Sequence, residues 1–101
     1  MNENKTAQIK QVIAKIDIGK ISLLLQEHST SKTLRRIIRY SKRISDSSND
    51  QEIFKLGTYL AYYLDTICDA EKTDYVKDET ERKYWLELSE ELFKHTIGIK
   101  K

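Results

Sequence analysis

The strongest apolar pattern in the chain lies between residues 53 and 68. Apolar side chains recur there at spacings of three and four, at Ile53, Leu56, Leu60, Leu64, Ile67 and Cys68. This spacing places them on one side of an α-helix. The apolar surface is widened by three tyrosines, Tyr59, Tyr62 and Tyr63. A helix this apolar needs neighbours on more than one side, so we predict that residues 51–71 form the central helix of an all-helical bundle.

A first helix is predicted over about residues 6–27. Its main core face would hold Ile9, Val12, Ile13, Ile16 and Leu23. Gly19 occupies a position where that face expects a side chain, and we interpret it as a point of close helix packing. Ile18, Ile21 and Leu25 fall on an adjacent face. Either the apolar arc is wide, or the helix is distorted near Asp17–Gly19. The polar run 28–31, His-Ser-Thr-Ser, ends this helix and caps the next.

Two further helices follow from the same periodicity. Residues 32–45 carry a core stripe of Leu34, Ile37, Ile38, Ser41 and Ile44, and the polar run 46–50 forms a loop. Residues 75–96 carry the stripe Trp85, Leu88 and Leu92. Thr73 or Asp74 would cap this last helix, or Asp78 would begin it one turn later. Short connections favour antiparallel neighbours, so we predict one all-α domain over residues 1–101, an antiparallel up-down four-helix bundle.

Composition narrows the class of protein. The chain has 101 residues, no proline and three glycines, which suits continuous helices. Its single cysteine, Cys68, excludes an internal disulfide framework and a cysteine metal cage. No apolar run approaches the ~20 residues that span a bilayer, and no signal peptide is recognisable. We therefore expect a cytoplasmic protein, with peripheral attachment to the inner face of the cell membrane as an open alternative.

Charge is distributed unevenly along the chain. The second predicted helix carries six cations and no acid before Ser45: Lys32, Arg35, Arg36, Arg39, Lys42 and Arg43. Residues 69–91 carry nine acids against four cations, a local balance of −5, although the whole chain is only +2. The simpler expectation is that these faces meet at a groove or partly cancel across it. The alternative is that the two poles recognise a charged partner.

The sequence does not predict an enzyme. His28 and His95 fall at helix ends, and there is no HExxH, glycine-rich phosphate loop or nucleophile elbow. Glu87, Glu90 and Glu91 are not accompanied by the ExxH pairing of bundle metal sites. Cys68 lies on the apolar stripe, where a lone cysteine is usually an inert small hydrophobe. We expect no catalytic residue, no cofactor, no metal and no small-molecule substrate.

Two surfaces are candidates for binding. The first predicted helix, the turn at 28–31 and the basic second helix could mimic a DNA-binding helix-turn-helix. That face offers no Asn or Gln for adenine and the net charge is small, so we rank DNA binding below a face neutralised by counter-charge. The six tyrosines are the second candidate, since Tyr62 and Tyr63 cannot both point inward. One should lie at a partly exposed groove, where tyrosine suits an interface and a core edge equally well.

The architecture resembles the immunity proteins of class IIa (pediocin-like) bacteriocins, of the enterocin A immunity type. The likeness is carried by residues 9–11, Ile-Lys-Gln, and by residues 23–30, Leu-Leu-Leu-Gln-Glu-His-Ser-Thr. The Thr80/Glu81 opening of an amphipathic last helix is also compatible. Family members often continue for longer after the fourth helix, whereas only residues 97–101 follow it here.

The resemblance implies a protein that stays inside the producing cell and protects it. Its partner would be the membrane-embedded mannose phosphotransferase permease with bacteriocin bound, and the C-terminal half would carry specificity. No family binding motif is matched, so partner-binding residues are chosen by position alone: Tyr62, Tyr63, Lys94, Ile97, Ile99, Lys100 and Lys101. The alternatives are a phage- or plasmid-encoded helical inhibitor of a host protein and a small DNA-binding regulator using the basic second helix.

Overall fold

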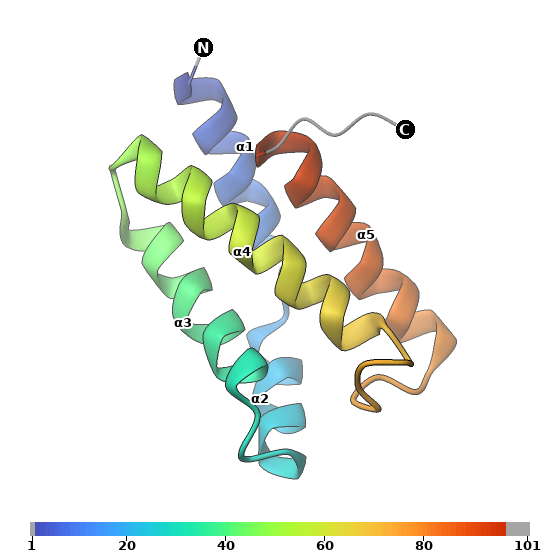
Figure 1. The fold of residues 1–101 in the computed structure, drawn as a ribbon. Coiled ribbons are helices and arrows are strands. Elements are labelled where there is room, and N and C mark those ends of the chain that lie inside the picture. The colour runs from blue at the N-terminus through green and yellow to red at the C-terminus, as the bar shows by residue number, and fades with distance from the viewer. Residues whose placement is uncertain (1, 97–101) are drawn as a thin grey trace.

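The computed structural model describes residues 2–96, which form helices and no strand. The elements are α1 (Asn2–Lys15), α2 (Ile18–Glu27), α3 (Lys32–Asp46), α4 (Asp50–Cys68) and α5 (Glu79–Thr96). In Figure 1, α4 runs between α3 and α5, and α1 crosses behind it. The predicted all-α class is confirmed. The described residues contain five helices rather than the four of the predicted bundle, because the predicted first helix is two helices.

The break between α1 and α2 lies at Asp17. The backbone of Asp17 is extended, and its carboxylate accepts a hydrogen bond from the Lys20 amide at 3.2 Å, as an N-cap does. The Tyr84 hydroxyl of α5 donates to the carbonyl of Lys15 and accepts from the amide of Asp17. A side chain distant in the sequence thus satisfies two backbone groups that a continuous helix would pair internally.

The break corrects two predictions about the first 27 residues. Leu23 was placed on the core face, but it is 61% exposed, because α2 starts a new helical register after Asp17. Ile21 is the residue of α2 that is buried instead. Gly19 is exposed in the first turn of α2, where an added Cβ would meet only the Asp17 carboxylate at 3.2 Å. It therefore does not mark close helix packing, and distortion near Asp17–Gly19 is the reading that holds.

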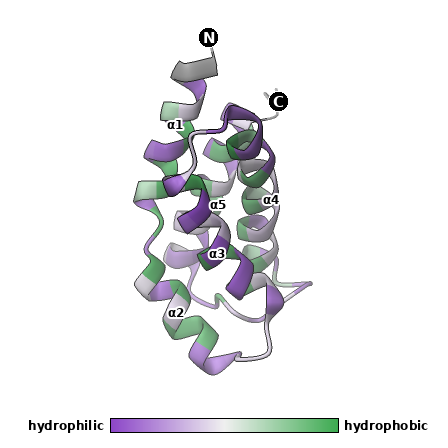
Figure 2. Ribbon diagram, turned by 90° about the vertical axis from the view of Figure 1, so that its left-hand side faces the viewer, coloured by the Kyte–Doolittle hydropathy of each residue, from purple (hydrophilic) through white to green (hydrophobic). Residues whose placement is uncertain are grey.

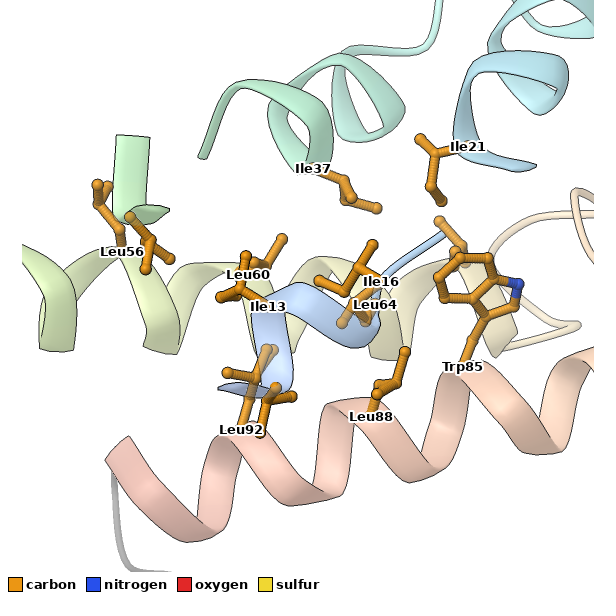
Figure 3. Packing of buried hydrophobic residues seen from close by; sticks show 14 of the residues in the cluster. Ile13, Ile16, Ile21, Ile37, Leu56, Leu60, Leu64, Trp85, Leu88 and Leu92 are labelled. Atoms are coloured by element: carbon orange, nitrogen blue, oxygen red, sulfur yellow. The ribbon is translucent and has the colours of Figure 1, made fainter. Parts of the chain in front are cut away.

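The core is organised around α4, as its apolar pattern predicts. α4 contacts α1, α3 and α5, and its Leu56, Leu60 and Leu64 are buried. Figure 3 shows Leu60 and Leu64 among side chains from every other helix. These partners are Ile13 of α1, Ile16 directly after α1, Ile21 of α2, Ile37 of α3, and Trp85, Leu88 and Leu92 of α5. Burying a side chain of this size contributes roughly 1.5–3 kcal/mol.

One glycine allows the helices to approach closely. A Cβ added to the buried Gly57 of α4 would lie 2.9 Å from a methyl carbon of Thr96 and 3.6 Å from one of Ile9. Those residues come from the last turn of α5 and from α1. Because Gly57 has no side chain, the end of α5 and α1 can both approach the backbone of α4 at this position.

The helix ends depart from the predictions at two places. α4 ends at Cys68 rather than near residue 71, because Asp69 is extended and caps the helix through its own amide. α5 begins at Glu79 rather than 75. A carboxylate oxygen of Asp78 accepts from the Glu81 amide at 3.0 Å, so the later of the two predicted starts is correct. The intervening segment is held by the buried Val76 and by a Tyr75 ring 4.4 Å from that of His28.

Candidate functional site

The neighbouring tyrosines of α4 lie in different surroundings. Tyr62 is 55% exposed, and its ring meets Phe93 of α5 edge-on with centroids 5.0 Å apart. Tyr63 is half-buried and turns the other way, towards Tyr40 of α3 at 5.8 Å. The prediction that the two do not point inward equally is confirmed, although the groove expected beside one of them stays a prediction. Two separate aromatic surfaces result, one on each flank of α4.

The first surface, here the α4–α5 patch, consists of Tyr62, Phe93 and Leu86. Leu86 and Phe93 are seven residues apart on α5, so they share one side of that helix. Leu86 is 36% exposed and Phe93 is partly buried. The sequence reasoning named Tyr62 but missed both α5 residues. The sequence contained one indication of them. Leu86 and Phe93 are apolar but lie beside the core stripe of Trp85, Leu88 and Leu92, so they form an additional apolar surface on the helix.

The second surface, here the α3–α4 cluster, consists of Tyr40, Tyr59, Tyr63 and Arg36. The rings of Tyr40 and Tyr59 are 6.3 Å apart. The Arg36 guanidinium lies 5.8 Å from the centre of the Tyr63 ring, within cation–π range, and its Nη1 is 3.5 Å from the Tyr63 hydroxyl. Tyr63 is therefore a support for Arg36 rather than a free contact residue.

The cations of α3 form a row along its outward side, here the α3 cation row. Its members are Lys32, Arg35, Arg36, Arg39, Lys42 and Arg43. All are exposed except the partly buried Arg36, and Figure 2 views the molecule from this side. Within residues 2–96, Arg43 alone of these six pairs with a carboxylate, Glu52, at 2.6 Å. Lys32, Arg39 and Lys42 make no hydrogen bond or ion pair with another described residue.

The ion pair of Arg43 with Glu52 is part of the hydrogen-bond network of the loop that joins α3 to α4. Glu52 accepts hydrogen bonds from the Ser47 hydroxyl at 2.8 Å and from Arg43, and these lower the pKa of its carboxyl. The Glu52 amide in turn donates to the Asn49 side chain, which caps α4. Arg43 thus helps to hold the loop. The other five cations of the row have no carboxylate partner among the described residues.

In residues 2–96, the acids of α5 form no ion pair with the α3 cation row. α3 contacts α1, α2 and α4, but within the described residues it has no contact with α5. The α5 acids that form bridges to other helices use α1 and α2 instead: Glu91 pairs with Lys15 and Glu81 with Lys20. The expectation that the basic face meets the acidic face across a groove is therefore wrong for the acids of α5. α4 separates the two poles, as the arrangement in Figure 1 makes clear.

The remaining candidate residues lie elsewhere. Lys94 is exposed and lines a shallow hollow between α1 and α5 with Lys15, Tyr84 and Glu91, apart from the α4–α5 patch. Four more candidates, Ile97, Ile99, Lys100 and Lys101, lie outside the described residues. Of the described candidates, Tyr62 and Tyr63 lie on different flanks of α4, and Lys94 lies in the hollow between α1 and α5.

No constellation for metal chemistry is present in the described part of the chain. Residues 2–96 contain no group of three or more His, Cys, Asp or Glu side chains that could hold a metal ion. Cys68 is 6% exposed, and burial raises the pKa of its thiol to about 12. At such a pKa almost none of the thiol is in the nucleophilic thiolate form near neutral pH.

Comparison with known proteins leaves the family open. No protein-family model, no curated protein and no solved structure matches this chain. Among the described helices, none is long and apolar enough to cross a membrane.

Proposed function

We propose that this chain is an immunity protein for a class IIa bacteriocin. It acts in the cytoplasm of the producing cell, without catalysis, by binding the mannose phosphotransferase permease once bacteriocin has engaged it. The α4–α5 patch is the contact surface. The proposal starts from the resemblance in residues 9–11 and 23–30. The all-helical fold is compatible with it.

The observation that carries the proposal is the exposed ring of Tyr62 packed edge-on against Phe93. Tyrosine offers a large rigid contact area with a polar tip, and such residues often provide most of the binding energy of an interface. The Phe93 contact holds the Tyr62 ring in place before a partner arrives, which reduces the entropy lost on binding. Both residues lie in the C-terminal half, where the resemblance puts specificity.

The test is a growth assay with the protein produced inside a sensitive strain. The wild-type chain should protect against one or a few members of a panel of class IIa peptides, and purified protein added outside should give no protection. Tyr62→Ala and Phe93→Ala should each reduce protection at least tenfold in the inhibitory peptide concentration, because truncating an anchor costs about 1–2 kcal/mol or more.

Leu23→Ala is the matched control. Leu23 is more exposed than Tyr62, but it lies on α2, away from the patch. Its removal should leave protection unchanged, and circular dichroism should show that all three variants are folded. If the folded, abundant wild-type protein protects against no member of the panel, the immunity function is wrong. The inhibitor of a host protein would then be the next hypothesis.

A further inference from the structure

We propose that α3 is a docking surface for duplex DNA, presented by the turn that follows α2. This inference does not depend on the proposed function, because it uses the opposite flank of α4 from the α4–α5 patch. The sequence ranked DNA binding below a face neutralised by counter-charge, because the face offers no Asn or Gln for adenine and the net charge is small. Within the described residues α3 has no contact with acidic α5, so the acids of that helix do not supply the counter-charge.

The first step is electrostatic. Five of the six cations in the row pair with no carboxylate in residues 2–96. Like charges three and four residues apart on a helix repel, so the row carries a cost that the chain itself does not offset. A polyanion would offset it and would release its own condensed counterions. The relevant quantity is the local field at α3, which a net charge of +2 for the whole chain does not describe.

The second step is geometric. Arg35, Arg39 and Lys42 follow at spacings of four and three, so they share the outward side of α3. From residue 32 to residue 43 the row extends about 17 Å along the helix axis. The B-DNA major groove, about 12 Å wide, admits a single helix of this kind. Arg35, Arg39 and Lys42 are all exposed, so this side of α3 is open to such a groove.

The third step is the way in which α3 is presented. The short α2, a turn at residues 28–31 and α3 succeed one another as the two helices of a helix-turn-helix do, and α2 packs against α3. The turn is fixed by hydrogen bonds. The Ser31 hydroxyl accepts from the Leu34 amide at 3.1 Å, and the Ser31 amide donates to the His28 carbonyl at 2.9 Å. The break at Asp17 is what makes α2 short enough for this comparison.

The chemistry of the row favours nucleic acid over an acidic protein. Four of the six cations are arginines, whose planar fork matches a phosphate or the O6 and N7 of guanine in two parallel hydrogen bonds. Arg35 already donates to the Ser29 carbonyl at 2.6 Å, and Arg36 lies against Tyr63, so both heads are held in place. The row contains no Asn or Gln for adenine. We therefore expect binding dominated by phosphates, with a weak preference for G·C steps.

The experiment measures fluorescence anisotropy of a labelled duplex of about 20 mixed base pairs, titrated with protein at several salt concentrations. If the row makes four phosphate contacts, the logarithm of the association constant should fall with the logarithm of the salt concentration with a slope of about −3.6. The affinity should then fall about 150-fold when the salt concentration rises from roughly 50 to 200 mM. The variant Arg35→Ala/Arg39→Ala/Lys42→Ala should bind at least tenfold more weakly at the lower salt, with a slope near about −1.

The matched control is Lys55→Ala/Lys77→Ala/Lys83→Ala. It removes the same number of charges from exposed positions outside α3 and should bind as the wild type does. Equal loss in both triple variants would show a general charge effect and overturn the proposal. So would the absence of binding at the lower salt, or binding as tight to polyglutamate or to phosphatidylglycerol vesicles. These last two outcomes would assign the row to an acidic protein or to a lipid surface instead.

Discussion

At the scale of single residues, the surroundings set by tertiary packing decide what each side chain can do. Tyr62 and Tyr63 are neighbours in sequence, yet one is exposed beside Phe93 and the other supports Arg36. Cys68 shows the same dependence for chemical reactivity. Its Sγ lies 3.6 Å from the Arg82 carbonyl, and burial holds its pKa far above that of a free thiol.

The reactivity of Cys68 gives a prediction at this scale. The thiolate is the form that reacts with alkylating reagents, and a pKa of about 12 leaves almost none of it near neutral pH. Iodoacetamide should therefore label native protein at least a hundredfold more slowly than protein unfolded in urea. Mass spectrometry of the intact chain measures both rates. Equal rates in the two conditions would place Cys68 at the surface and contradict the packing of α4.

At the scale of elements, the division of the first predicted helix is decided by contacts from α5. Asp17 supplies a cap, but the Tyr84 hydroxyl pairs with the carbonyl of Lys15 and the amide of Asp17 on the two sides of the break. Lys15 and Lys20 also pair with α5 acids at 3.3 and 3.1 Å. These exposed pairs add little stability, whereas the hydroxyl satisfies backbone groups that would otherwise lack partners.

The expected effect of Tyr84→Phe follows from those two hydrogen bonds. The substitution keeps the ring and removes the hydroxyl, so the free energy of unfolding should fall by about 1–2 kcal/mol. Urea denaturation followed by circular dichroism measures the change. Tyr59→Phe is the control, because the exposed Tyr59 hydroxyl makes no hydrogen bond to a described residue, and its stability should match the wild type. A Tyr84→Phe protein as stable as that control would show that α5 does not hold the break.

At the scale of the whole molecule, α4 has two roles. It supplies the core surface against which α1, α3 and α5 pack, and it holds the basic and acidic helices on opposite flanks. A small domain of this length has a marginal free energy of unfolding, about 5–10 kcal/mol. A substitution that disrupts the packing of α4 should therefore unfold the whole domain.

The prediction at this scale is that Leu60→Asp unfolds the protein. Leu60 is fully buried, and a carboxylate there would lack both water and a partner, which costs several kcal/mol. Thermal denaturation should show no cooperative transition. Tyr62→Asp introduces the same group two residues later at an exposed position and should still melt cooperatively. A cooperative melt of Leu60→Asp near the wild-type temperature would show that the core is elsewhere.

The candidate site was only partly predictable from the sequence. The exposure of one tyrosine at 62–63 followed from helical geometry, because adjacent residues point about 100° apart. The pairing of Tyr62 with Phe93 did not, because it depends on which side of α5 lies along α4. The absence of contact between α3 and α5 could not be predicted from the sequence either, because the order of charges along a chain does not show which helices become neighbours.

By itself, the sequence determined the helical class, the central place of α4 and most of its buried residues, because period-3.6 spacing of apolar side chains is a local property. It also determined the position of the cations on one side of α3. Only the tertiary structure decided that residues 6–27 divide at Asp17, that Leu23 is exposed and that the poles lie apart. Those features depend on contacts between residues far apart in the chain, such as Tyr84 with Lys15, and helical periodicity carries no information about such contacts.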